Sequence, residues 1–128
     1  MAPVLIQHKP HEAMTLVSLE RFEELATEAL EALPEWIRER MDNVYIAIEG
    51  FPPADNPRLL GLYQGVPLTQ RSVAYAGLPD KITLFRSTIE RGLTSEWNLR
   101  EEIRHVLVHE VAHFMGISDQ ELMDMGRY

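Results

Sequence analysis

The stretch that decides the fold is residues 95–119, which read SEWNLREEIRHVLVHEVAHFMGISD. Ser95 is a favourable N-cap, and Glu96 places negative charge in the first turn of the helix that follows. The pattern predicts a helix that runs to about Met115. It should end at Gly116, because glycine readily adopts the left-handed conformation that closes many helices.

The second half of this predicted helix, Val106–Met115, is apolar on nearly every side except at His109, Glu110 and His113. A helix with such a pattern belongs in the centre of a domain. Burying three polar side chains there without partners would cost free energy. A bound cation would satisfy all three, so we interpret them as a metal site rather than as core residues.

The spacing of the three residues indicates which of them bind the metal and which acts as the base. Residues 109 and 113 are four apart, so both imidazoles project from one side of a helix about one turn apart and can bind one Zn²⁺. Glu110 lies on the flank of that face, where its carboxylate reaches a water on the metal. We therefore predict His109 and His113 as zinc ligands and Glu110 as the general base of a hydrolase.

The ligand types fit a catalytic site better than a structural one. The chain has no cysteine, which excludes disulfides, thiolate zinc sites and a cysteine nucleophile. A zinc ion must therefore be held by histidine and carboxylate, and that chemistry is typical of catalytic zinc. The absence of cysteine also excludes the peptide deformylase pattern, in which a cysteine completes the H-E-x-x-H site.

The third ligand is expected after the helix ends. Only fifteen residues, 114–128, follow His113, which leaves little room for a ligand on a distant later helix. Gly116 lets the backbone turn sharply and bring Asp119 back toward the metal. Asp119 is thus the predicted third ligand, with Glu121 and Asp124 as alternatives.

His105 continues the same four-residue series, but it lies too far along the helix axis to share one metal with His113. We expect it at the rim of the cleft or behind the ligands.

The rest of the chain predicts a small mixed α and β domain. Ser18 should cap an amphipathic helix with a Glu-rich outer face, ending near Pro34, and residues 34–41 should form a short helical turn. The predicted strands have β-rich or alternating sequences bounded by Gly, Pro, Asp and Asn: Val44–Glu49, Leu59–Gln64 and Lys81–Arg86. A last short helix is expected at Asp119–Met125.

The length, composition and charge of the chain limit the classes of protein to which it can belong. The 128 residues, 45% of them hydrophobic and 25% charged, fit one soluble globular domain, here residues 16–128 after a flexible lead-in at 1–15. A net charge of −8 argues against nucleic acid and anionic membranes as partners. The first fifteen residues do not resemble a secretory signal, and no stretch approaches the apolar length of a membrane span. We expect a cytoplasmic protein; oligomeric state is left open.

The string His109-Glu-Val-Ala-His-Phe-Met-Gly-Ile-Ser-Asp119 resembles the H-E-x-x-H-x-x-G-x-x-D signature of the minimal zincins, small bacterial metallopeptidase-like proteins. Segments 60–69 and 78–86 and the acidic first helix are similar to the same family. The resemblance implies a compact zincin-like α+β fold, in which a small mixed sheet packs against the N-terminal amphipathic helix and a central H-E-x-x-H helix. It also implies zinc bound by His109, His113 and Asp119, with Glu110 as base.

The expected function is a zinc-dependent metallopeptidase acting on peptide or protein substrates. The alternatives are a metal-stabilised interaction domain without catalysis and a zinc hydrolase acting on a non-peptide amide. By analogy with zincins, an extended peptide should add to the edge of the sheet above the active-site helix, and Ile82–Phe85 is the expected edge. The side chain that stabilises the oxyanion is not evident from sequence; the candidates by residue type are Tyr63, Tyr75, Arg127 and Tyr128.

Overall fold

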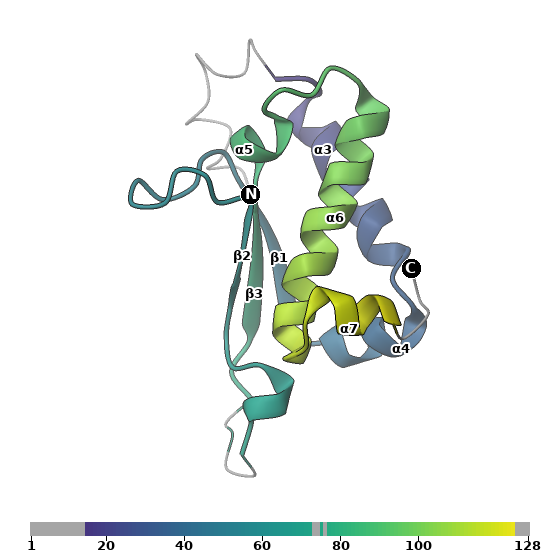
Figure 1. The fold of residues 1–128 in the computed structure, drawn as a ribbon, viewed down its shortest axis with the longest axis vertical. Helices are drawn as coiled ribbons and strands as arrows, with labels where there is room; N and C mark the ends of the chain where they lie inside the picture. The colour runs from purple at the N-terminus through teal and green to yellow at the C-terminus, as the bar shows by residue number, and fades with distance from the viewer. Residues whose placement is uncertain (1–14, 73–74, 76, 125–128) are drawn as a thin grey trace.

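The computed structural model describes residues 15–72, 75 and 77–124. Residues 1–14 of the predicted lead-in, 1–15, therefore lie outside the described residues. Within them, no helix is long and apolar enough to cross a membrane. The described chain is a small three-stranded sheet with its main helices on one side, as Figure 1 shows.

The central element is helix α6, Glu96–Met115, which confirms the predicted helix at both ends. The hydroxyl of Ser95 accepts a hydrogen bond from the backbone N–H of Asn98, and Gly116 closes the helix with a φ of 78°. Its buried side chains include Glu110 and eight apolar residues: Leu99, Ile103, Val106, Leu107, Val111, Ala112, Phe114 and Met115.

Helix α3, Leu19–Glu31, packs along α6 and is the predicted amphipathic helix. Ser18 is its N-cap and accepts a hydrogen bond from the backbone N–H of Arg21. Part of its acidic face is paired rather than simply solvated, because Glu28 lies 3.3 Å from Arg100 and Arg21 lies 2.7 Å from Glu96. These partly exposed pairs join the two helices, although each contributes little stability by itself.

The sheet is mixed, and its strand order is β1-β3-β2. Strand β1, Val44–Glu49, runs parallel to β3, Asp80–Phe85, with Ile46 opposite Ile82. Strand β2, Gly61–Gln64, runs antiparallel to β3, with Tyr63 opposite Ile82. Strands β2 and β3 both pack against α6.

The strand order corrects one prediction. Ile82–Phe85 is not an edge of the sheet, because β3 is hydrogen-bonded on both sides and is buried along nearly its whole length. A strand with two neighbours has no free backbone groups to offer a peptide. The edge beside α6 is β2, whose outer side pairs with no strand among the described residues.

Short helical elements complete the fold. Helix α4, Glu35–Arg38, and the 3₁₀ turn η1, Glu39–Met41, form the predicted turn before β1. Helix α7, Asp119–Asp124, follows α6 and crosses its C-terminal end (Figure 1). The sequence did not predict the 3₁₀ turn η2, Leu68–Gln70, or helix α5, Arg86–Glu90.

Helix α5 depends on contacts with distant parts of the chain. It has no side-chain cap, and residue 86 was predicted to end a strand. A buried ion pair joins Arg86 to Glu90 at 2.9 Å, and the hydroxyl of Thr88 donates to the carbonyl of Leu59 at 2.7 Å. The Arg86–Glu90 pair is a local i,i+4 contact. The bond from Thr88 to Leu59, and a second bond from the side chain of Arg86 to the carbonyl of Val17, join residues far apart in the chain, and these tertiary contacts hold the short helix.

Replacing Ile103 by alanine should reduce the free energy of unfolding by about 2–5 kcal/mol, because this fully buried side chain would leave a cavity between α6 and its neighbours. Urea denaturation measures the change. Trp97→Ala on the same helix is the matched control, since Trp97 is 63% exposed and should change stability by no more than about 0.5 kcal/mol. Equal losses in both variants would contradict the position assigned to α6.

Candidate metal centre

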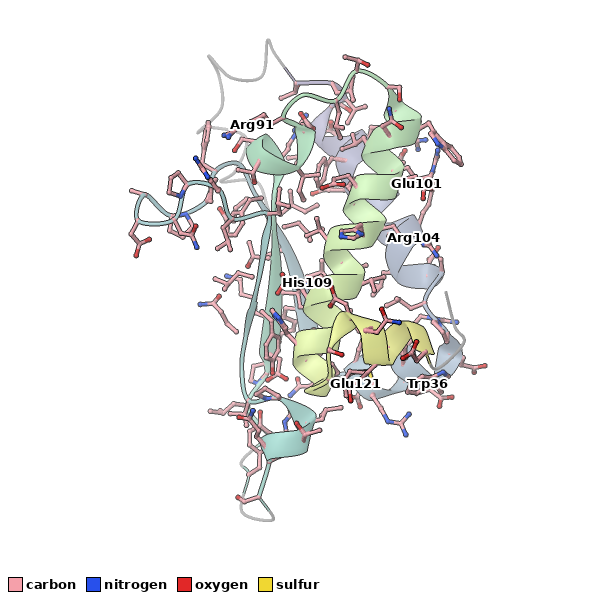
Figure 2. All side chains as sticks on the ribbon, in the orientation of Figure 1. Trp36, Arg91, Glu101, Arg104, His109 and Glu121 are labelled. Atoms are coloured by element: carbon pink, nitrogen blue, oxygen red, sulfur yellow. The ribbon has the colours of Figure 1, made fainter. Side chains whose placement is uncertain are left out.

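His109 and His113 project together from the second half of α6, one turn apart, as their spacing predicts. Their ring centroids are 4.5 Å apart in an edge-on arrangement. Their side chains are 44% and 52% exposed, although most of the second half of the helix that carries them is buried. The two imidazoles thus lie on the single open stripe of a core helix, where an ion from solvent can reach them; Figure 2 labels His109 there.

Glu110 lies beside the two histidines but is buried, with its side chain only 6% exposed. Its Oε1 lies 3.2 Å from Nδ1 of His113. One ligand atom from each of His109, Glu110 and His113 falls within 4.8 Å of the others. The three side chains therefore converge as a metal centre requires, and two imidazoles with a neighbouring carboxylate are a donor set that suits zinc.

Asp119 also reaches the cluster. Gly116 ends α6 and lets the chain reverse, with backbone hydrogen bonds from Gly116 to the carbonyl of His113 and from Ile117 to that of Ala112. The Oδ2 atom of Asp119 then lies 2.6 Å from Nδ1 of His109. Asp119 thus contacts one of the two histidines, as a further ligand or an outer partner of a ligand would.

The two alternative third ligands are engaged elsewhere. Ser118 caps α7, and Glu121 completes a capping box, because its carboxylate accepts from the backbone N–H of Ser118 at 2.8 Å. Asp124 accepts a hydrogen bond from the side chain of Gln120. Of the three predicted third ligands, Asp119 is the one that the structure brings into contact with a histidine of the cluster, His109.

Gly61 sets the distance between the edge strand and the site. A Cβ atom at this position would lie 2.8 Å from Cγ1 of Val106 and 3.1 Å from Cγ of Glu110. The backbone of β2 therefore contacts α6 at the turn that carries the carboxylate. Sequence analysis did not single out Gly61, although an isolated glycine in a strand pattern is a signal of close backbone approach.

Two adjoining cavities open beside the cluster. One, of about 340 Å³, is lined by His109, Glu110 and the segment from Asn56 to Gly61. The other, of about 590 Å³, extends along α6 toward its N-terminus and includes Asp119. Leu60 and His105 line both cavities, which places His105 at the rim of the cleft, as the sequence predicted.

The two predicted oxyanion candidates that lie within the described residues, Tyr63 and Tyr75, are engaged elsewhere. The hydroxyl of Tyr63 donates to Asp80 at 3.0 Å, and the hydroxyl of Tyr75 donates to the carbonyl of Leu78. Partial burial, together with the hydrogen bond to Asp80, raises the pKa of Tyr63 to about 12. Both tyrosines thus belong to a network around buried Asp80 that also includes Arg71. Arg127 and Tyr128 lie outside the described residues.

The sequence profile of the zincin-like metallopeptidases matches residues 41–127, which include all three strands, α6 and Asp119. The chain belongs to this family. The match covers most of the chain and confirms the resemblance drawn from the H-E-x-x-H string. The observed mixed sheet packs against α6, α3 packs against α6 in the same hydrophobic core, and this arrangement confirms the predicted α+β zincin-like fold.

The fold of this zincin-like protein is also found among solved structures. A conserved hypothetical protein from Thermus thermophilus aligns with 87% of this chain and 100% of its own, at a TM-score of 0.54 and 21% sequence identity. At that identity the likeness concerns the fold alone. No curated protein sequence is significantly similar to this chain.

Replacing Gly61 by alanine should destabilise the protein by about 1–3 kcal/mol, because the added methyl group overpacks the contact with Val106 and Glu110. Thermal and urea denaturation measure the loss. Gln64→Ala, an exposed position on the same strand, is the control and should be neutral. A Gly61→Ala protein as stable as the wild type would show that β2 does not approach α6 this closely.

Proposed function

We propose that this protein is a zinc-dependent peptidase that hydrolyses peptide bonds in extended, unstructured segments. The observation that carries the proposal is the convergence of three side chains on α6: His109 and His113 on its open stripe, and the buried carboxylate of Glu110 beside them. Membership of the zincin-like metallopeptidases supports the same chemistry.

In this proposal His109, His113 and Asp119 hold the metal, and Glu110 is the general base. Zinc, when bound, would lower the pKa of a water ligand to about 7 and polarise the substrate carbonyl. Glu110 accepts the proton of the attacking water and later delivers it to the departing amine. Its burial behind the histidines holds the carboxylate in one place, because the methylene groups contact Gly61.

An extended substrate would lie along the outer side of β2. The order β1-β3-β2 leaves the N–H and C=O groups on this side of β2 without a strand partner among the described residues. A peptide added there would gain backbone hydrogen bonds in any sequence. Leu60, the residue before β2, lines both adjoining cavities, which provide room for side chains next to the bond that is cleaved.

Two other functions were weighed from sequence. A metal-stabilised interaction domain has no need for a buried carboxylate beside its ligands, whereas Glu110 is in that position. A hydrolase of small non-peptide amides would use the same cluster, but the length of the cleft along α6 favours an extended substrate.

Glu110→Gln should retain near-stoichiometric zinc and lose peptide hydrolysis by about 10²–10⁴-fold, because glutamine keeps the shape of glutamate but cannot accept the proton. Bound metal is quantified by elemental analysis of tag-free protein, and cleavage is followed with a library of unstructured peptides. Glu31→Gln, on the exposed face of α3, is the control and should be fully active. Zinc-loaded wild-type protein that cleaves no member of the library would instead support the interaction domain.

Asp119→Ala should weaken zinc binding by more than about 100-fold, which exceeds the loss usually seen when an outer partner of a ligand is removed. Competition with a fluorescent chelator measures the affinity. Asp124→Ala removes the same group from the same helix, away from His109, and should leave zinc affinity unchanged. Equal affinities in the two variants would eliminate Asp119 as the third ligand.

A further inference from the structure

Peptide hydrolysis develops negative charge on the carbonyl oxygen under attack, and a donor placed against this oxyanion contributes strongly to the rate. The base Glu110 occupies one wall of the cleft, on α6. Tyr63 and Tyr75 donate their hydroxyl hydrogens to Asp80 and to Leu78. The donor is therefore expected among other side chains on the wall opposite α6.

The opposite wall is the segment from Asn56 to Gly61, and its cationic residue is Arg58. Arg58 lines the same cavity as His109 and Glu110, across from the helix that carries both. It lies three residues before Gly61, whose backbone contacts Glu110.

The backbone next to Arg58 is held in place by contacts from three sides. The N–H of Leu59 donates to the carbonyl of Asn56 at 3.3 Å, which closes a turn around Arg58. The carbonyl of Leu59 accepts from the hydroxyl of Thr88 at 2.7 Å, and the carbonyl of Leu60 accepts from the N–H of Phe85 at 2.9 Å. The guanidinium is thus attached to fixed backbone, although the side chain itself is exposed.

Within the part of the chain that the structure describes, the charge of Arg58 has no ionic partner. Most arginines of the described chain pair with a carboxylate or donate to a backbone carbonyl, and Arg58 takes part in none of the ion pairs found there. A guanidinium carries five N–H donors and stays charged at any relevant pH. In a protein of net charge −8, such a cation at the mouth of the cleft is suited to an anion that forms there.

We infer that Arg58 is a catalytic residue that donates hydrogen bonds to the oxyanion of the proposed reaction. This inference rests on the proposed function. In the first step the water oxygen bonds to the carbonyl carbon, and the π electrons of the carbonyl move to its oxygen as Glu110 takes the proton. In the second step these electrons re-form the carbonyl, the C–N bond breaks, and the amine leaves with the proton that Glu110 held. Arg58 transfers no proton and stabilises only the charge on oxygen.

Two neighbours are less suited to this role. His105 lines the cavity, but from α6, on the same wall as the base. Asn56 is on the opposite wall, but its amide is neutral and its side chain is shorter. Arg58 alone among these three combines a full charge with the wall facing Glu110.

The test compares wild type, Arg58→Ala and Arg58→Lys as full-length, zinc-loaded proteins. The probe is a phosphinic peptide capped at both ends and carrying apolar side chains, because its tetrahedral anion imitates the oxyanion and offers no other charge. Titration calorimetry gives its Kd, and peptide cleavage gives kcat and KM. Arg91→Ala is the control: Arg91 also lacks an ion pair within the described chain, is exposed, and lines a different cavity, well away from His109 in Figure 2.

Arg58→Ala should keep its zinc and weaken probe binding and kcat roughly 100-fold, with KM little changed, because the donor acts mainly on the charged state. Arg58→Lys should recover part of the loss, and Arg91→Ala should match wild type. Probe binding that is unchanged in Arg58→Ala, or absent in wild type, would overturn the assignment.

A rise in KM confined to peptides with acidic side chains would also overturn it, since Arg58 would then recognise substrate charge. If wild type and Arg58→Ala cleave peptides equally well, this inference is refuted but the proposed peptidase function stands. A wild type without hydrolysis refutes the peptidase, and the Kd of the probe then still reports on Arg58.

Discussion

The site depends on one contact, the close approach of the β2 backbone at Gly61 to the Glu110 side chain on α6. Because this contact buries the carboxylate next to exposed imidazoles, the same helix can belong to the core and carry a polar site. It also places strand β2, the outer strand of the sheet among the described residues, beside the turn of α6 that carries His109 and Glu110. A bulkier residue at position 61 would separate the edge from the helix and widen the cleft between them.

A second constraint acts at the other end of the site. Gly116 ends α6 with a positive φ, and a Cβ there would collide with the side chain of Thr69 in η2. The glycine therefore serves both the reversal of the chain and the packing of the turn that follows β2. The reversal brings Asp119 to His109, and the capping box between Ser118 and Glu121 starts α7 immediately at that point.

The network around Asp80 shows why residue type is a poor guide to role. Tyr63 packs edge-on against Phe114, and Arg71 lies over the ring of Tyr75 while pairing with Asp80. By residue type these aromatic hydroxyls suit oxyanion stabilisation. In the fold they anchor the segment between β2 and β3 against the last turn of α6, and the donor we propose is found in the loop before β2.

Local sequence determined α6 in full, because its N-cap, apolar pattern and closing glycine all act within a few residues; it also determined that His109, Glu110 and His113 share one face. Strand β1 and helix α3 followed from the same local rules. Tertiary structure alone decided that β3 is central and β2 is the edge, because strand order depends on pairing between residues far apart in the chain. It likewise decided the short helix α5, which long-range contacts hold, and the placement of Arg58 opposite Glu110, since that depends on where the 56–61 segment packs.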